Sequence, residues 1–145
     1  MLPLLLDKFF YVLYKIVYML GAGEMDNHRI QQYPKIVLSN EAFNSAIQDY
    51  DVCSNTRRKI FEVIGLLNAH GTNKTYLGKK IENTKRSNLW ELKIKGASKT
   101  EWRFLFKRIS GSDEYALLHF FLKKDEKIRD RDFATAERIA VREGW

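Results

Sequence analysis

In three successive segments between residues 89 and 124, the basic side chains lie an even number of positions apart, which is a period of two. Because alternate side chains of a β-strand point to opposite faces, this period of two predicts three strands with one charged face. A sheet face that carries Lys, Arg and His can hold a phosphate chain and do acid–base chemistry on it. The charged positions are Glu91, Lys93 and Lys95 in the first segment, Arg103 and Lys107 in the second, and His119 and Lys123 in the third.

The intervening positions of the same segments are apolar, so we expect them to form the packed face of the sheet. The aromatic residues among them share that face, which favours a place in the core over a base-stacking surface. His119 lies in a strongly apolar segment, where a structural histidine is an open alternative. The apolar positions are Trp90, Leu92 and Ile94, then Trp102, Phe104 and Phe106, and finally Ala116, Leu118, Phe120 and Leu122.

The positive charge lies almost entirely in the C-terminal part of the chain, whose formal net charge is +7 over 145 residues. Residues 1–56 hold 4 Lys and Arg against 6 Asp and Glu, whereas residues 57–145 hold 21 against 12. This asymmetry favours a polyanionic partner such as RNA, DNA or an acidic protein segment. Cys53 is the single cysteine, which fits a reducing, cytoplasmic location, and with three scattered histidines it makes no metal-binding pattern.

The N-terminal segment has three open interpretations. Residues 2–20 are strongly apolar but contain charged side chains, including Lys15, whereas a membrane span requires about 20 nearly uncharged residues. The alternatives to a membrane segment are an amphipathic helix and a start assigned upstream of a true start at Met25. Residues 21–34 have the composition of a linker, so we treat residues 1–34 as an N-terminal extension.

The elements around the three strands predict a single α+β domain. A short apolar run at 36–38 indicates a strand, and two helices follow it. Residues 72–88 are basic and show no regular pattern, and a last helix begins at Asp130 and ends at Gly144. The residues expected to face the core are Phe43, Ala46, Ile47 and Tyr50 in the first helix, Ile60, Val63, Ile64 and Leu67 in the second, and Phe133, Ala136, Ile139 and Ala140 in the last.

Four motifs in this order resemble the RelE/HigB superfamily of toxins from bacterial and phage toxin–antitoxin pairs. The similarity is closest to the phage-related HigB-like branch and covers residues 35–142. It implies a RelE-like fold, in which a small antiparallel-rich sheet packs against two N-terminal helices and a C-terminal helix, with residues 35–145 as the toxin domain. The motifs are Leu89–Lys95, residues 102–106, Leu117-Leu118-His119-Phe120-Phe121-Leu122-Lys123-Lys124, and Ala136 with Arg138.

The resemblance implies a cytoplasmic toxin that cleaves mRNA, usually on the ribosome. It also implies a cognate antitoxin, a small helix-turn-helix protein that silences the toxin. RNA carries its own nucleophile, the 2′-hydroxyl, so the enzyme must accept its proton, stabilise the phosphorane and protonate the leaving 5′-oxygen. No metal or cofactor is needed if fixed cations supply the stabilising charge.

The resemblance also assigns roles to individual residues. Arg103 aligns with the arginine that holds the scissile phosphate, and Lys93 with a basic residue used in catalysis. We expect Lys93 and Lys95 to hold the RNA backbone, one of them acting as base because neighbouring cations lower its pKa. His119 or Lys123 is the expected general acid. Further RNA-binding positions are Lys95, Lys107, Arg86 and Lys124, the last an alternative to Lys123 for the third basic residue of the family.

Two positions depart from the RelE pattern. Glu91 stands where the RelE branch has a second lysine, and Phe133 lies near the position of a catalytic tyrosine. The general base therefore stays open among Glu91, Lys95 and His119. The departures also keep two other functions open: a ParE-like toxin that inhibits gyrase without nuclease activity, and a degenerate toxin-like domain that only binds its partner.

Overall fold

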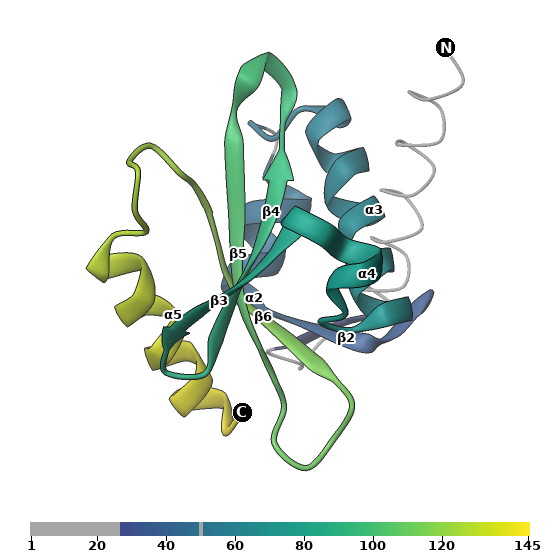
Figure 1. The fold of residues 1–145 in the computed structure, drawn as a ribbon, viewed down its shortest axis with the longest axis vertical. Helices are drawn as coiled ribbons and strands as arrows, with labels where there is room; N and C mark the ends of the chain where they lie inside the picture. The colour runs from purple at the N-terminus through teal and green to yellow at the C-terminus, as the bar shows by residue number, and fades with distance from the viewer. Residues whose placement is uncertain (1–26, 50) are drawn as a thin grey trace.

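A six-stranded mixed sheet separates two layers of helices in this computed structural model, which describes residues 27–49 and 51–145 (Figure 1). The strand order is β1-β2-β6-β5-β4-β3. Only β2 and β6 pair in parallel, and the other neighbours are antiparallel. The α+β class predicted from the sequence is confirmed. The strands are β1 (Asn27–Ile30), β2 (Tyr33–Ser39), β3 (Ile81–Arg86), β4 (Leu89–Lys95), β5 (Glu101–Arg108) and β6 (Tyr115–Leu122).

Two long helices lie on opposite sides of the sheet, α3 (Ser54–His70) on one side and α5 (Asp130–Glu143) on the other (Figure 1). The predicted first helix is a short α2 (Asn40–Phe43) that continues as the π-helical turn η1 (Asn44–Gln48). No helix in the described ranges has the length and apolar character needed to cross a membrane. The short helices are α4 (Lys74–Leu77), η2 (Gly78–Lys80) and η3 (Ala97–Lys99).

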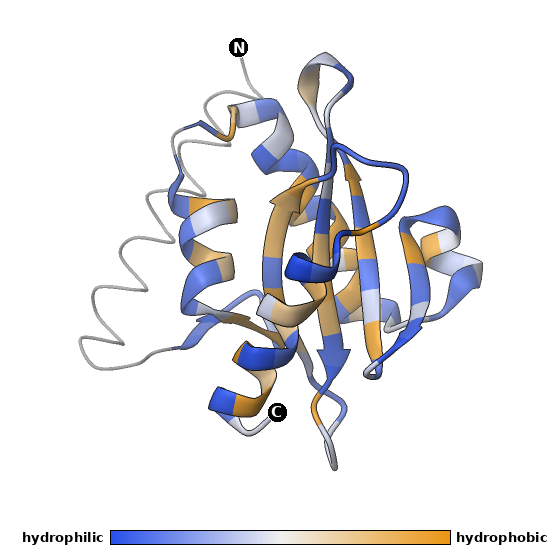
Figure 2. Ribbon diagram, turned by 90° about the vertical axis from the view of Figure 1, so that its left-hand side faces the viewer, coloured by the Kyte–Doolittle hydropathy of each residue, from blue (hydrophilic) through white to orange (hydrophobic). Residues whose placement is uncertain are grey.

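The sheet has an apolar core on each face. The larger core lies between the sheet and the α3 layer, and the smaller one lies under α5. Hydrophobic segments gather in the central strands, with hydrophilic segments around them (Figure 2). The predicted core residues of all three helices pack in these two clusters, except for Tyr50, which lies outside the described residues, as do residues 1–26.

One strand breaks the predicted alternation of faces. The register between β5 and β6 shifts between Leu105 and Phe106, so Leu118 is an extra residue in β6, a β-bulge. As a result, Ala116 and Leu118 pack in the smaller core under α5, whereas Phe120 packs in the larger core. The prediction that the even positions of 116–122 share one face is therefore wrong.

Two strands lie where the sequence suggested none. β1 pairs with β2, so residues 27–30 belong to the sheet and not to a linker. β3 forms a hairpin with β4 inside the supposedly irregular segment 72–88. Ser87 and Asn88 make the turn of this hairpin, and both have a positive φ, as the two-residue turns that suit twisted hairpins require.

Helix α5 covers only part of its sheet face. Its apolar stripe packs on one end of β4, β5 and β6, through Leu89, Leu105 and Leu118. The other end of the same face carries Lys93 and Arg103, which lie opposite each other on β4 and β5. The fold thus leaves a group of charged side chains beside the helix instead of beneath it.

Candidate active site

The register of the central strands arranges the predicted catalytic residues in two rows. Glu91 lies opposite Leu105, which lies opposite His119. One step along the strands, Lys93 lies opposite Arg103. Directly paired residues of antiparallel strands project from the same face, so these side chains share the face on which α5 packs. Neighbouring strands are about 4.8 Å apart, so roughly 10 Å separates the backbones of Glu91 and His119.

A cavity of about 530 Å³ opens at the edge of the sheet, and we call it the edge cavity. It forms because the pairing of β3 with β4 begins at Leu92, which leaves the last residues of β4 without a neighbouring strand on that side. Glu62 and Glu101 also line it, so the cationic side chains outnumber the acidic ones three to one. These cations are Lys59, Lys79, Lys80, Lys93, Lys95 and Arg103.

Lys93 lies between two carboxylates, and we call these three residues the Lys93 cluster. Its Nζ is 2.8 Å from Oε2 of Glu82 and 3.4 Å from Oε1 of Glu91. Glu82 and Glu91 are direct cross-strand partners on β3 and β4, which brings their carboxyl groups together. The Glu82 side chain is 57% exposed, whereas that of Glu91 is only 8% exposed.

The three groups of the Lys93 cluster have shifted pKa values. Burial raises the pKa of Glu91, and the nearby charges of Lys93 and Arg103 oppose this rise. The hydrogen bond from Lys93 lowers the pKa of Glu82. The same contact with Glu82 raises the pKa of Lys93. The raised pKa argues against Lys93 as the base, because its nearest neighbours are carboxylates and not cations. The expectation that one of the two lysines acts as base therefore stays a prediction for Lys95.

Arg103 is a buried cation at the edge cavity, with 5% of the residue exposed. Its guanidinium donates to the carbonyl oxygen of Trp102 at 2.9 Å and to Oε2 of Glu101 at 3.3 Å. Within residues 27–49 and 51–145, its Nε has no hydrogen-bond partner. Glu101 is half exposed, so the one carboxylate paired with this guanidinium lies at the surface. The guanidinium therefore has at least one N–H group without a hydrogen-bond acceptor among the described residues.

His119 is paired with a carboxylate from α5. Its Nε2 is 2.8 Å from Oδ1 of Asp132, and its ring stacks on Phe121 with centroids 5.0 Å apart. The side chains of His119 and Asp132 are 19% and 13% exposed, so both are partly buried. A carboxylate in this position fixes the orientation of the imidazole ring, which serves a structural role or a proton-transfer role equally well.

Glu91 and His119 are not among the residues that line the edge cavity, and neither are the other predicted site residues apart from Lys93, Lys95 and Arg103. Lys123 and Lys124 line a separate cavity of about 270 Å³ between the end of β6 and the start of α5. The Lys123 backbone N–H donates to the carbonyl oxygen of Glu101, so this second cavity begins next to the first. The structure therefore divides the predicted basic face into two neighbouring sites.

Arg86 and Lys107 have contacts that differ from their expected RNA-binding role. Arg86 donates to Asp130 and Glu137 of α5, and its guanidinium lies 4.5 Å from the ring centroid of Phe133. Lys107 donates to the backbone carbonyl oxygen of Trp145. Both side chains thus connect α5 and the chain end to the sheet, and their expected role in RNA binding stays a prediction.

Sequence analysis missed several residues of this site. Glu82 gave no signal, because the strand that carries it was not expected. Lys79 and Lys80 stood out only as part of a basic segment, and Lys59 as a cation near the start of a helix. Asp132 lies in the predicted last helix, but nothing in the sequence indicated that it contacts His119.

The comparison with known families gives one match. Residues 52–140, more than half of the chain, match the family described as Phage derived protein Gp49-like (DUF891). The matched segment includes the edge cavity and the Lys93 cluster. No curated protein and no solved structure matches the chain. The chain belongs to the Gp49-like family of phage-derived proteins, a family of RelE/HigB-like toxins.

Proposed function

We propose that this toxin is a metal-independent endoribonuclease that cleaves mRNA on the ribosome by attack of the 2′-hydroxyl on the adjacent phosphate. The observation that carries the proposal is Arg103, a buried guanidinium next to the Lys93 cluster at an open basic cavity. A guanidinium held in place can bind two phosphate oxygens and stabilise the negative charge that the phosphorane gains. Lys95, exposed at the same cavity, holds the RNA backbone.

Glu91 is the general base in this mechanism. Burial raises its pKa toward the pH at which it operates, which makes its carboxylate a better proton acceptor than an ordinary exposed glutamate. The carboxylate takes the proton from the 2′-hydroxyl while the O2′–P bond forms. Lys93 stays protonated between Glu82 and Glu91 and keeps their charges compensated.

His119 is the general acid, on the other side of Arg103. As the P–O5′ bond breaks, the protonated imidazole gives its proton to the leaving 5′-oxygen, and Asp132 holds the ring in position. The products are a 2′,3′-cyclic phosphate and a 5′-hydroxyl. Lys123, near the end of β6, is the alternative acid.

Membership of a toxin family implies a cognate antitoxin. We propose a helix-turn-helix protein that covers the edge cavity with an acidic or amphipathic segment, because the cavity presents several cations. Such a segment excludes RNA from the site and silences the toxin.

Inducible expression of the full chain in bacteria, with mapping of mRNA 5′ ends, tests the proposed cleavage. We expect growth arrest and new 5′-hydroxyl ends inside translated frames. Arg103→Ala lowers cleavage by at least about 100-fold, because it removes the main stabilising charge of the phosphorane. Circular dichroism of the purified variant checks that the fold survives, since Arg103 is buried.

Two further variants keep this test decisive if Arg103→Ala fails to fold. Lys95→Ala changes an exposed side chain of the edge cavity and reduces cleavage, whereas Arg138→Gln removes an exposed charge on α5 and leaves cleavage unchanged. Arrest with intact mRNA and damaged DNA would instead identify a ParE-like gyrase inhibitor. A folded wild-type chain that causes no arrest would point to a degenerate, partner-binding domain.

A further inference from the structure

The edge cavity continues into a second basic cavity, which we call the lateral cavity. The lateral cavity has a volume of about 400 Å³ and lies beside α4, η2 and the start of β3. Lys79 and Lys93 line both cavities, so the two spaces adjoin. A chain of phosphates that occupies the edge cavity at Arg103 therefore has a continuous basic path past Lys93 and Lys79 toward Lys74.

The lysines along this path have no ion-pair partners. No salt bridge among the described residues involves Lys74, Lys79 or Lys80, and all three are exposed. By contrast, Lys93 on the same path is held by Glu82 and Glu91. Glu82 also lines the lateral cavity, where the charge of Lys74 helps to lower the pKa of its carboxyl group. The lysines nevertheless outnumber the carboxylates along the path, and a polyanion that binds there compensates their excess positive charge.

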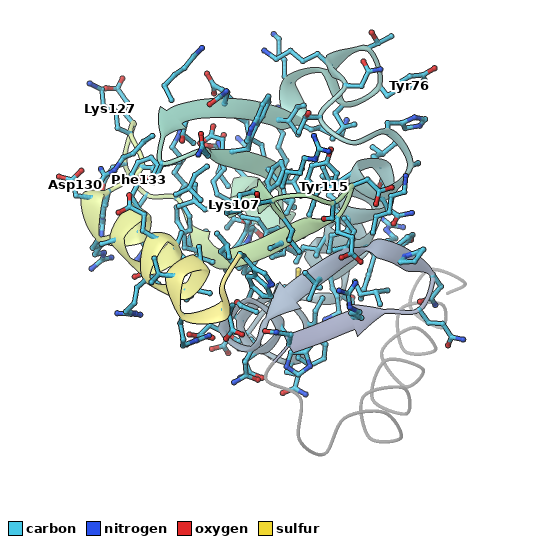
Figure 3. The ribbon with its side chains drawn as sticks, turned by 90° about the horizontal axis from the view of Figure 1, so that it is seen from below. Tyr76, Lys107, Tyr115, Lys127, Asp130 and Phe133 are labelled. Carbon is cyan, nitrogen blue, oxygen red and sulfur yellow. The ribbon has the colours of Figure 1, made fainter. Side chains whose placement is uncertain are left out.

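An exposed aromatic ring of α4, the helix that also carries Lys74, forms a stack with a residue of α3. Tyr76 of α4 is 57% exposed and lies at the periphery of the molecule (Figure 3). Its ring stacks on His70 with centroids 3.8 Å apart and planes within 5° of parallel. The next residue, Leu77, is buried and anchors α4 in the larger core. One residue of this short helix thus holds it in place, while its neighbour presents a ring at the surface.

We propose that the lateral cavity and the Tyr76–His70 stack form a subsite for single-stranded RNA that flanks the scissile phosphate. The proposed subsite rests on the proposed nuclease function. It adds to that function a preference for single-stranded RNA. Lys74 and Lys79 hold the adjacent phosphates, and Tyr76 stacks on an unpaired base. Basic side chains interleaved with an exposed aromatic ring are the combination that binds single strands, because every base has a flat face and every nucleotide a phosphate. An acidic peptide would use the lysines but not the ring.

Fluorescence anisotropy with the full chain and a labelled, 2′-O-methyl single-stranded RNA tests the subsite, because this RNA binds without being cleaved. Tyr76→Ala is expected to weaken binding by about 5- to 100-fold, the range for loss of one base stack. Tyr76→Phe keeps the ring and binds like the wild type. Lys79→Ala weakens binding by about 3- to 10-fold and makes the salt dependence shallower, with a slope about 0.7 smaller.

The controls separate this subsite from general electrostatics and from the nuclease proposal. Arg138→Gln removes one positive charge from α5, on the opposite side of the sheet from α4, and leaves binding unchanged (Figure 1). Equal affinity for RNA in Tyr76→Ala and the wild type, or equal competition by polyglutamate, would overturn the subsite. Binding that follows the expected pattern in a protein that cleaves no RNA would overturn only the nuclease function.

Discussion

The two halves of the sheet face on which α5 packs differ in what their basic side chains contact. Beneath and beside α5, Arg86 is held by Asp130, Glu137 and the ring of Phe133. At the uncovered end, Arg103 has an N–H group without a hydrogen-bond acceptor among the described residues and borders an open cavity. The difference follows from the length and position of one helix, because the strands supply basic residues along the whole face. A basic residue of this sheet face contacts α5 where the helix covers the face. Where the helix does not cover it, the residue borders the open cavity.

The largest effect that sharpens this comparison is expected for Glu91→Gln, in the Lys93 cluster at the boundary of the uncovered end. Cleavage falls by about 10²- to 10⁴-fold, because the variant removes the general base. The pH–rate profile also loses the rise that the wild type shows as Glu91 deprotonates. Cleavage of a defined RNA between pH 4 and pH 9 measures both. Full activity in this variant would transfer the role of base to Lys95 or His119.

The same variant is expected to change stability in the opposite direction. The folded protein raises the pKa of Glu91 above its ordinary value of 4.5, so the folded state holds this proton more tightly than the unfolded state. Stability from this group is therefore present below pH 4.5 and is lost as the pH rises through the folded pKa. Glu91→Gln should unfold at a higher temperature than the wild type at pH 7, and the difference should vanish at pH 4. A lower unfolding temperature at pH 7 would mean that Glu91 is needed to hold Lys93.

The covered half is best tested by Phe133→Ala. Phe133 packs partly buried against the smaller core and supports the Arg86 guanidinium. Its truncation should lower the free energy of unfolding by about 1–2 kcal/mol, because it exposes apolar surface. Cleavage should stay near the wild-type level at a temperature where the variant is folded. Chemical denaturation and RNA cleavage measure the two effects, and a specific loss of cleavage in the folded variant would place Phe133 in the site.

The sequence predicted the strands in which apolar and charged residues alternate clearly. It missed strands without this alternation. β4 and β5 alternate between apolar and charged residues, so the sequence predicted that Lys93 and Arg103 share a face, and the structure adds that they lie opposite each other. β3 is polar because it is an edge strand, and its turn uses Ser87 and Asn88 instead of a glycine pair. Glu82 therefore stayed unrecognised as the partner of Lys93.

The bulge in β6 was invisible for a different reason. Both faces of this strand are buried, so apolar residues occupy odd and even positions alike and the period carries little information. Leu118 could therefore not be recognised as the extra residue. The sequence also did not indicate how much of the sheet face α5 covers, because this depends on how the helix packs. The sequence thus predicted which residues of the site are charged, but not which residues they contact.

The smallest expected effect concerns the end of α5, where Arg142 binds Glu41 of α2 through two hydrogen bonds of 2.6 and 2.8 Å. Arg142 lowers the pKa of Glu41, so the stabilisation is present above the ordinary pKa of 4.5 and is lost as the pH falls through the folded pKa. Because both side chains are substantially exposed, Glu41→Gln should cost only about 0.5–1 kcal/mol at pH 7. Urea denaturation at pH 7 and pH 3 measures the difference, which should disappear at the lower pH. A larger cost accompanied by loss of cleavage would show that this contact sets the position of α5 and hence the boundary between the covered and uncovered halves of the sheet.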